Sequence, residues 1–375
     1  MQIKKENFSK NSMDFILLIT VILLLSLGII MVLSASSPSA LAQEGNSYKY
    51  VVRQAIFAIL GFIAMIVISK YDYHNYDKGK RYILIYVGCV ILLALVPLIG
   101  VETNGAKRWI DLGFTTFQPS ELVKLGLILF YASLLTRIKD KLKHIGWGFF
   151  YPLALLIPII GILIVFQTHM SASLIIIILT GILMLMAGTR IAHCIVVGVP
   201  AAAALLAAIL LKGEGFRMGR VMTWLDPWSD LTGDGWQIVQ SLYAVGSGGL
   251  FGAGLGNSKQ KYLYIPEPHN DFIFAVLAEE LGFVGCFIVI ALFAVFIWRG
   301  IVIAMKAPDM FGSLTAIGIT SLIGIQVIIN IAVVTNSMPV TGMPLPFFSY
   351  GGTALMIILA SVGVLLNISR AGNKL

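Results

Sequence analysis

Charged residues are scarce in this sequence, and that scarcity limits the class of protein. Only 12% of the 375 residues are Asp, Glu, Lys or Arg, whereas 58% are hydrophobic. Soluble globular domains carry about 25% charged residues, so half that fraction excludes a soluble protein. The apolar residues form runs of about 18 or more along the whole chain, which is the length that a helix needs to cross a bilayer.

Cysteines and familiar catalytic motifs are also scarce. The three cysteines each lie within an apolar run, with no CxxC, so neither a disulfide framework nor a zinc site is indicated. The sequence has no GxxxxGK[ST], which gives no sign of an ATP-driven pump, and no HExxH among its five histidines. The net charge of +8 is not a nucleic-acid signal, because the basic residues lie in short loops between apolar runs.

The apolar runs predict an all-α, polytopic membrane protein with ten transmembrane helices and a single membrane domain, residues 1–375. Each span should be helical, because the bilayer core offers no water to hydrogen-bond with the backbone. The predicted spans are 15–35, 51–69, 82–100, 119–136, 148–166, 172–188, 192–211, 271–297, 312–335 and 351–368.

The loop charges predict the orientation. An even number of spans places both termini on one side of the membrane. If that side is the cytoplasm, sixteen of the 26 Lys and Arg residues lie in cytoplasmic segments, as the positive-inside rule requires. We therefore expect a multi-pass protein of the cytoplasmic membrane with both termini in the cytoplasm.

The segments on the opposite side differ from the short basic loops. Residues 101–118, 212–270 and 336–350 are rich in Trp, Tyr, Pro, Gly and charge. The second of them, between the seventh and eighth spans, is too long for a simple connection, and long loops are usually functional or disordered. Its six Trp and Tyr residues argue against disorder and suit the membrane interface. Any chemistry is therefore expected at this outer boundary.

Two pairs of charged residues lie three positions apart near this boundary. Glu121 and Lys124 begin the fourth span and share one helix face. They are either a structural ion pair or part of a cavity, where ionisable groups in membranes usually lie. Arg217 and Arg220 form either a solvated basic patch or a clamp for phosphate oxygens, for which arginine is well shaped.

Asp271 is the most informative acidic residue. It ends the segment Tyr264-Ile-Pro-Glu-Pro-His-Asn-Asp271, in which two prolines keep the chain extended. It lies at or near the N-cap of the eighth span, so the residues alone also allow a purely capping role. Glu279 and Glu280 lie about two turns deeper and have no evident purpose. The glycine-rich run 246–256 permits either close helix packing or a flexible or re-entrant loop.

Three long segments resemble the SEDS family, whose members include FtsW, RodA and SpoVE. They are TNGAKRWIDLGFTTFQPSELVKL (103–125), DPWSDLTGDGWQIVQSLYAVGSGGLFGAGLGNSKQKYLYIPEPHNDFIFAVLAEELGFVG (226–285) and NSMPVTGMPLPFFSYGGT (336–353). The resemblance spans essentially the whole chain. The stretch LGNSKQKYLYIPEPHNDFIFA favours the FtsW and SpoVE branch over RodA.

This resemblance implies ten helices, cytoplasmic termini and a glycosyltransferase that polymerises lipid II into peptidoglycan strands for cell division or spore cortex synthesis. It implies that Asp271 is catalytic. The substrate-binding candidates are Trp109, Glu121, Lys124, Arg217, Arg220, Glu267 and His269. No protein-held metal and no organic cofactor are expected, although a divalent cation, Mg²⁺ or Mn²⁺, could accompany the lipid diphosphate. The expected partners are a class B penicillin-binding protein and other division or sporulation membrane proteins.

The sequence departs from the family at one turn and leaves two alternatives open. Where many members read Gln-Pro-Asp-x-Gly-Thr after the fifth span, this chain has Gln167-Thr168-His169-Met170-Ser171-Ala172-Ser173. A structural role for that turn survives the change, but a catalytic acid there does not. The alternatives to a polymerase are a lipid II flippase, which would move substrate without forming glycosidic bonds, and a non-catalytic scaffold of the division machinery.

Overall fold

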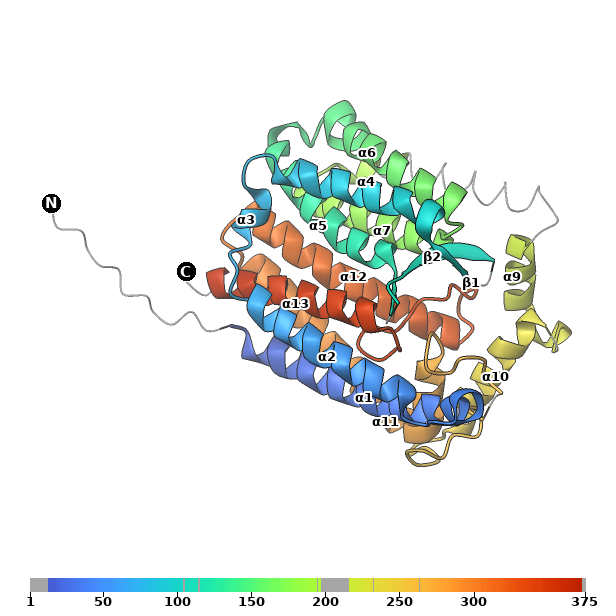
Figure 1. Cartoon of the computed structure of the whole chain (residues 1–375). Coiled ribbons are helices and arrows are strands. Elements are labelled where there is room, and N and C mark those ends of the chain that lie inside the picture. The colour runs from blue at the N-terminus through green and yellow to red at the C-terminus, as the bar shows by residue number, and fades with distance from the viewer. Residues whose placement is uncertain are drawn as a thin grey trace.

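The protein is a bundle of long helices with a small β-ribbon and two shorter helices at one end (Figure 1). The computed structural model describes residues 13–103, 105–113, 115–193, 195–196, 216–231, 233–262 and 264–372. The α-helices within them are α1 (Phe15–Glu44), α2 (Lys49–Ile68), α3 (His74–Asp77), α4 (Arg81–Ile99), α5 (Pro119–Arg137), α6 (Tyr151–Gly161), α7 (Met170–Ala187), α9 (Phe216–Leu225), α10 (Asp234–Ser247), α11 (Ile273–Met305), α12 (Met310–Val334) and α13 (Gly352–Gly372).

Nine helices in the described part of the chain are long and apolar enough to span a membrane. They correspond to nine of the ten predicted spans, so the polytopic, mainly helical architecture is confirmed. The predicted span 192–211 falls almost entirely outside the described residues. The fifth span runs from Ile145 to Phe166 and includes two stretches of wider, π-type turns, η2 (Ile145–Phe150) and η3 (Ile162–Phe166), at either end of α6.

The two ends of the described chain meet at one end of the bundle. Asp14 caps α1 by accepting a hydrogen bond from the Leu17 amide. The Asp14 amide in turn donates to Ser369 Oγ in the last turns of α13, at 3.1 Å. The carboxylate of Asp14 also pairs with Arg299 of α11. Both ends of the described chain therefore lie on the same side, as an even number of spans requires.

Helix α5 lies among α4, α7, α12 and α13, and most of its side chains are buried. In contrast, α2 and α4 expose rows of Ile, Leu and Val on the outside of the bundle. Because water does not reach the bilayer core, such an outer surface suits a lipid environment. The core is therefore protein-filled around α5, with lipid-compatible surfaces at the periphery.

The opposite end of the bundle carries the segments that the sequence marks as external, and we call it the site end. Here β1 (Val101–Thr103), β2 (Ala106–Asp111) and β3 (Thr116–Phe117) form an antiparallel ribbon in the order β1-β2-β3. The register pairs Val101 with Trp109 and Ile110 with Phe117. This ribbon lies in the predicted external segment 101–118, for which the sequence analysis proposed no strands.

The long segment before α11 is folded, as its aromatic residues indicated. It contains α9, the short turn η4 (Pro227–Ser229) and α10, and α10 packs against α11 (Figure 1). Helix α11 is longer than predicted and is broken at Gly282, whose φ of 65° and ψ of −165° are not helical. Only glycine adopts such a conformation readily.

Candidate active site

Residues 264–271, which we call the strap, cross the site end and lead into α11. Pro266 and Pro268 flank Glu267, whose φ of 45° is unusual for a residue other than glycine. Such backbone strain is often found at functional sites. It persists only where surrounding contacts fix the chain, and the strap has such contacts.

Three consecutive carbonyl groups at the end of the strap are anchored. The His269 carbonyl accepts a 2.8 Å hydrogen bond from the Tyr350 amide. The other two bonds, from Ser349 Oγ to the Asn270 carbonyl and from Asn330 Nδ2 to the Asp271 carbonyl, are both 2.7 Å. The position of Asp271 is therefore fixed by α12 and by the residues that precede α13.

The Asp271 carboxylate is partly exposed, lies close to Gly342 and is within electrostatic range of Arg220. A Cβ atom on Gly342 would lie 3.7 Å from Asp271 Oδ2. Burial raises the pKa of Asp271 to about 6, and the charge of Glu267 adds to the rise, whereas its own backbone amide and Arg220 oppose it. At neutral pH the carboxylate is therefore still mostly ionised, with a pKa suited to a general base.

The capping role considered for Asp271 is wrong. Helix α11 begins at Ile273, and Phe272 occupies the N-cap position without a side-chain hydrogen bond. A helix N-terminus favours the charged form of a nearby carboxylate, yet burial outweighs that effect and raises the pKa of Asp271. The Asp271 carboxylate therefore does not cap α11, and the capping role no longer competes with a catalytic role.

Glu121 and Lys124 share one face of α5, as their spacing predicted. Lys124 Nζ lies 2.7 Å from Glu121 Oε2, and both side chains are buried, with relative exposures of 1% for Lys124 and 6% for Glu121. A buried pair at the start of a span is stable only while both partners are present. The structure shows the ion pair and leaves its possible contact with substrate a prediction.

Two arginines add positive charge at the site end. Arg220 of α9 donates from Nη1 to the Val340 carbonyl (3.1 Å), so α9 is tied to the segment 336–350. Arg108 of β2 donates to the carbonyls of Gln167 (3.2 Å) and Thr168 (2.7 Å). Burial lowers the pKa of Arg108, and the nearby charge of Arg220 lowers it further. We call Arg108, Lys124 and Arg220 the basic cluster.

Sequence reasoning missed Arg108, although it lies directly before the predicted Trp109. Trp109 is half-buried on β2, and alternation along a strand points its side chain to the face opposite Arg108. Arg217 lies in α9, but its side chain is outside the described part of the structure. Of the predicted pair Arg217 and Arg220, the structure therefore describes the side chain of Arg220.

His169 lies near the basic cluster, in the turn where the sequence departs from the family pattern. Burial lowers the pKa of His169 to about 3, and the charges of Arg108 and Lys124 lower it further. The imidazole is therefore neutral at physiological pH, and its buried Nδ1 has no hydrogen-bond partner in the described structure. A neutral residue thus stands where many family members place an acid, so this turn adds no negative charge beside Arg108 and Lys124.

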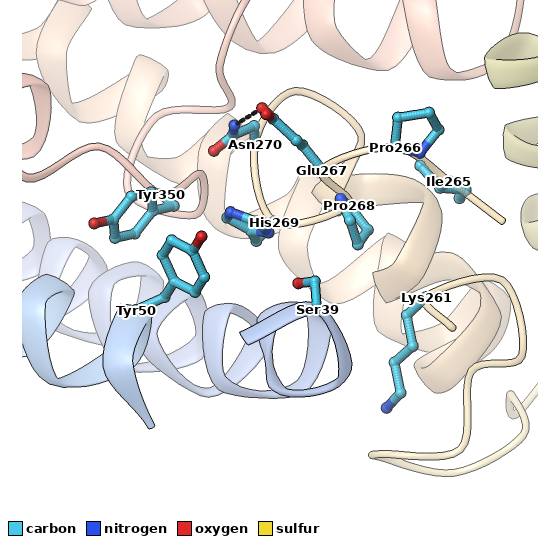
Figure 2. A pocket seen from close by; sticks show the side chains of 10 residues that line it. All are labelled: Ser39, Tyr50, Lys261, Ile265, Pro266, Glu267, Pro268, His269, Asn270 and Tyr350. Atoms are coloured by element: carbon cyan, nitrogen blue, oxygen red, sulfur yellow. Dashed lines mark hydrogen bonds between the residues drawn. The ribbon is translucent and has the colours of Figure 1, made fainter. Parts of the chain in front are cut away.

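The strap also forms one wall of a cavity of about 420 Å³ (Figure 2). Two predicted substrate-binding residues, Glu267 and His269, line this cavity, whereas Asp271 and the basic cluster do not. The remaining lining comes from the end of α1, the first turn of α2 and the segments around 261–270 and 350: Ser39, Tyr50, Lys261, Ile265, Pro266, Pro268, Asn270 and Tyr350. The structure therefore separates the predicted site residues into two groups at the site end.

The glycine-rich run is inserted at the break in α11. The helical bonds expected from the Phe283 and Val284 amides are replaced by bonds to the carbonyls of Gly249 (2.9 Å) and Leu250 (3.1 Å). The carbonyls of Glu279 and Glu280 accept instead from the amides of residues 253 (2.9 Å) and 254 (3.0 Å). These four backbone groups at the break thus find new partners, as a low-dielectric environment requires.

The side chains of Glu279 and Glu280 hold the segment that leads into the strap. Lys261 Nζ lies 2.8 Å from Glu280 Oε1 and 3.0 Å from Ser34 Oγ of α1, and both charged side chains are fully buried. Glu279 accepts from the Lys259 amide (2.8 Å) and from Ser258 Oγ. The sequence left these two carboxylates without a purpose, and the structure shows that they anchor residues 258–261.

Within the described residues, no three His, Cys, Asp or Glu side chains converge in a way that could hold a metal ion. The basic cluster is likewise a poor set of cation ligands, because arginine and lysine present only donors. These residues therefore suit an anion.

The chain is similar to known proteins over nearly its whole length. Over 367 residues, 96% of this chain and 98% of the relative, the chain is 42% identical to stage V sporulation protein E of Bacillus subtilis. It is 40% identical to a probable peptidoglycan glycosyltransferase FtsW of Geobacter sp. strain M18, over 95% of this chain and 96% of the relative.

Two solved structures share the fold. One is a chain of a peptidoglycan synthase complex that coordinates polymerization and crosslinking, with a TM-score of 0.80, 30% identity and coverage of 96% of this chain and 98% of that chain. The other is the rod shape determining protein RodA of Thermus thermophilus, with a TM-score of 0.71, 28% identity and coverage of 96% and 97%. The model of the FtsW/RodA/SpoVE family, described as cell cycle protein, matches residues 15–374. This chain therefore belongs to the FtsW/RodA/SpoVE family.

Proposed function

We propose that this protein is a peptidoglycan glycosyltransferase that polymerises lipid II into glycan strands at the outer face of the cytoplasmic membrane. The observation that carries the proposal is the position of Asp271. The residue is anchored through its carbonyl, and its carboxylate has a pKa of about 6 and lies within electrostatic range of Arg220 of the basic cluster. The names of the relatives, FtsW and stage V sporulation protein E, support a role in cell division or spore cortex synthesis.

The reaction joins two lipid-linked saccharides without a covalent enzyme intermediate. A hydroxyl oxygen of the acceptor attacks the anomeric carbon of the donor, and the bond between that carbon and the diphosphate oxygen breaks, with inversion. Asp271 takes the hydroxyl proton as general base. The lipid diphosphate leaves with the bonding electrons, and Arg220 and Arg108 stabilise its negative charge.

Asp271→Asn tests this mechanism in a lipid II polymerisation assay with glycan strands resolved on a gel. Asparagine keeps the size of the side chain but is no base, and α11 does not need Asp271 as a cap. We expect normal folding and a rate reduced by about 10²-fold or more. The control is Asp111→Asn, the same change at an exposed carboxylate that accepts only from the Gly113 amide among described contacts. A folded Asp271→Asn protein that makes strands at the parent rate would refute the proposal.

The membrane orientation and the partner belong to the same proposal. The basic loops support a cytoplasmic position of both termini, and the site end would then face outward. We further propose a one-to-one complex with a class B penicillin-binding protein, because a similar chain belongs to a synthase complex that coordinates polymerization and crosslinking. Other division or sporulation membrane proteins are further expected partners. Native purification that yields only monomer from cells containing the intact transpeptidase would contradict the complex.

The divalent cation expected with the diphosphate remains a prediction. Chelation with EDTA during the polymerisation assay, followed by addition of Mg²⁺ or Mn²⁺, tests it. A rate that depends on the added ion would place the cation with the substrate, since the described residues offer no cluster of ligands.

A further inference from the structure

The cavity beside the strap has the composition of a ligand site. Three aromatic rings meet there: the Tyr50 ring lies 4.5 Å from that of His269 and 5.0 Å from that of Tyr350, measured between centroids. Figure 2 shows these rings grouped opposite Glu267 and Asn270, which share a 2.6 Å hydrogen bond. Its volume of about 420 Å³ falls in the range of small-molecule sites, about 300–1,000 Å³.

One polar atom in this cavity lacks a partner. His269 is only 5% exposed, and its Nδ1 has no hydrogen-bond partner among the described residues. Buried polar atoms are nearly always hydrogen-bonded, so this wall of the cavity contains a hydrogen-bonding group whose partner is not among the described residues. Burial lowers the pKa of His269 to about 4, so the ring is neutral and can donate or accept one hydrogen bond on each nitrogen according to its tautomer.

The charge of the cavity differs from that of the basic cluster. The Lys261 ammonium is committed to Glu280, Ser34 and the Gly256 carbonyl, and Figure 2 shows it directed away from the rings. Glu267 contributes an exposed carboxylate. The cavity therefore offers no uncommitted positive charge to a diphosphate, while its carboxylate and amide groups suit the hydroxyl and amide groups of a neutral molecule.

We propose that the cavity is a saccharide subsite, which holds an uncharged sugar ring of the glycan beside the ring that reacts at Asp271. The proposal rests on the proposed function. Aromatic faces combined with a few polar groups suit a sugar ring, which is apolar on its C–H faces and polar at its edge. Asp271 does not line the cavity, so the ring held there is a neighbouring one.

Such a subsite would retain the growing strand between additions. The two ends of the strap would then have different roles. The end with Asp271 lies near the basic cluster, where the diphosphate leaves. The part from Glu267 to His269 holds a neutral sugar ring. Contacts to a non-reacting ring supply binding energy away from the reacting bond. Weakening them should shorten the strands, because an enzyme that loses its product more readily completes fewer additions for each encounter.

Chitotetraose, an uncharged tetramer of N-acetylglucosamine, is a suitable probe because it lacks both lipid and diphosphate. Its binding to the purified full-length protein in nanodiscs can be measured by titration calorimetry. We expect Tyr50→Ala and Tyr350→Ala to weaken binding by about threefold to tenfold, the scale of a lost aromatic contact. Tyr50→Phe should retain most of the affinity, because the ring remains. Tyr48→Ala is the matched control, since Tyr48 is exposed and does not line the cavity.

Binding of inorganic diphosphate, measured on the same variants, tests whether the basic cluster and the cavity bind different ligands. Arg220→Gln should weaken diphosphate binding but not chitotetraose binding, and Tyr50→Ala should do the reverse. Equal chitotetraose affinity in the parent, Tyr50→Ala and Tyr350→Ala proteins would overturn the subsite, as would displacement of chitotetraose by diphosphate or no binding to the parent.

Strand synthesis from lipid II by the same preparations separates the two proposals. Shorter strands from Tyr50→Ala than from Tyr48→Ala support the subsite, and equal lengths overturn it. If the unmutated protein makes strands but does not bind chitotetraose, the subsite is refuted and the proposed function stands. If the unmutated protein binds chitotetraose through Tyr50 but makes no strands with its partner present, the proposed function is refuted.

Discussion

The buried ion pair between Lys261 and Glu280 offers a direct test of how the strap is held. Its relative exposures are 3% and 0%, and Glu280 also accepts from Ser34 Oγ at 2.6 and 2.7 Å. The pair closes a loop from residue 261 to residue 280 with Asp271 near its middle. Removing one partner leaves the other charge buried and unpaired, which costs about 3–5 kcal/mol, whereas replacing both charges is often nearly neutral.

The perturbations are Lys261→Met, Glu280→Gln and the double change. Methionine keeps an apolar stem of similar length, and glutamine can still bond with Ser34. We expect each single change to lower the free energy of unfolding by about 3–5 kcal/mol, and the double change to cost less than either single change. The departure from additivity measures the interaction between the two residues.

Reversible unfolding in mixed micelles titrated with SDS, followed by tryptophan fluorescence, gives these free energies. The comparator is the ion pair of Arg137 and Asp77, which has the same 2.8 Å separation but relative side-chain exposures of 39% and 31%. A half-exposed pair contributes about 0–1 kcal/mol, so the interaction measured between Arg137 and Asp77 by the corresponding double change should be small. Additive single changes at Lys261 and Glu280, or an interaction as small as that of Arg137 and Asp77, would refute the argument.

Three further predictions concern the site and its orientation. Polymerisation should fall as the pH decreases through about 6, and by about tenfold for each pH unit below that, because protonation of Asp271 removes the base; a flat kcat/KM profile between pH 5 and 8 would contradict this. Lys124→Ala should damage folding because it leaves Glu121 unpaired at membrane depth, and changing both residues to neutral ones should restore folding; activity restored with it would assign the pair a structural role. A reporter fused after Leu375 should report the cytoplasm and one inserted near Ser229 the exterior, whereas finding both on one side would break the topology.

Hydropathy predicted most of the fold because the membrane restricts the possible structures. Nine of the ten predicted spans correspond to long apolar helices, since only a helix satisfies every backbone group within one span. The i, i+3 spacing of Glu121 and Lys124 likewise predicted their contact, because helical geometry alone brings them together. Both predictions depend only on the local sequence and on the bilayer that surrounds the helices.

The parts that sequence reasoning missed depend on contacts between distant segments. Arg108 is held by carbonyls about 60 positions away, and backbone carbonyls have no sequence signature. The cavity joins Ser39 and Tyr50 to His269 and Tyr350, which only the packing of α1 and α2 against the strap brings together. The residues alone also allowed Asp271 a capping role, because Asp is a common cap residue, but α11 begins at Ile273 with Phe272 at the N-cap. The Asp271 carbonyl is instead held by the distant Asn330.

The break in α11 links the glycine-rich run to the position of the strap. Both interpretations of the run were partly correct, because it forms a loop that enters the bundle and its glycines allow a close backbone approach. A Cβ on Gly248 would lie 2.0 Å from the Ala278 carbonyl oxygen, and one on Gly252 would lie 2.1 Å from that of Glu280. An alanine at either position would push the run away from α11 and leave the carbonyls at the break without partners, which is costly in a low-dielectric environment. Because Glu280 also binds Lys261, the same insertion that satisfies the broken helix determines where the chain leading to Asp271 begins.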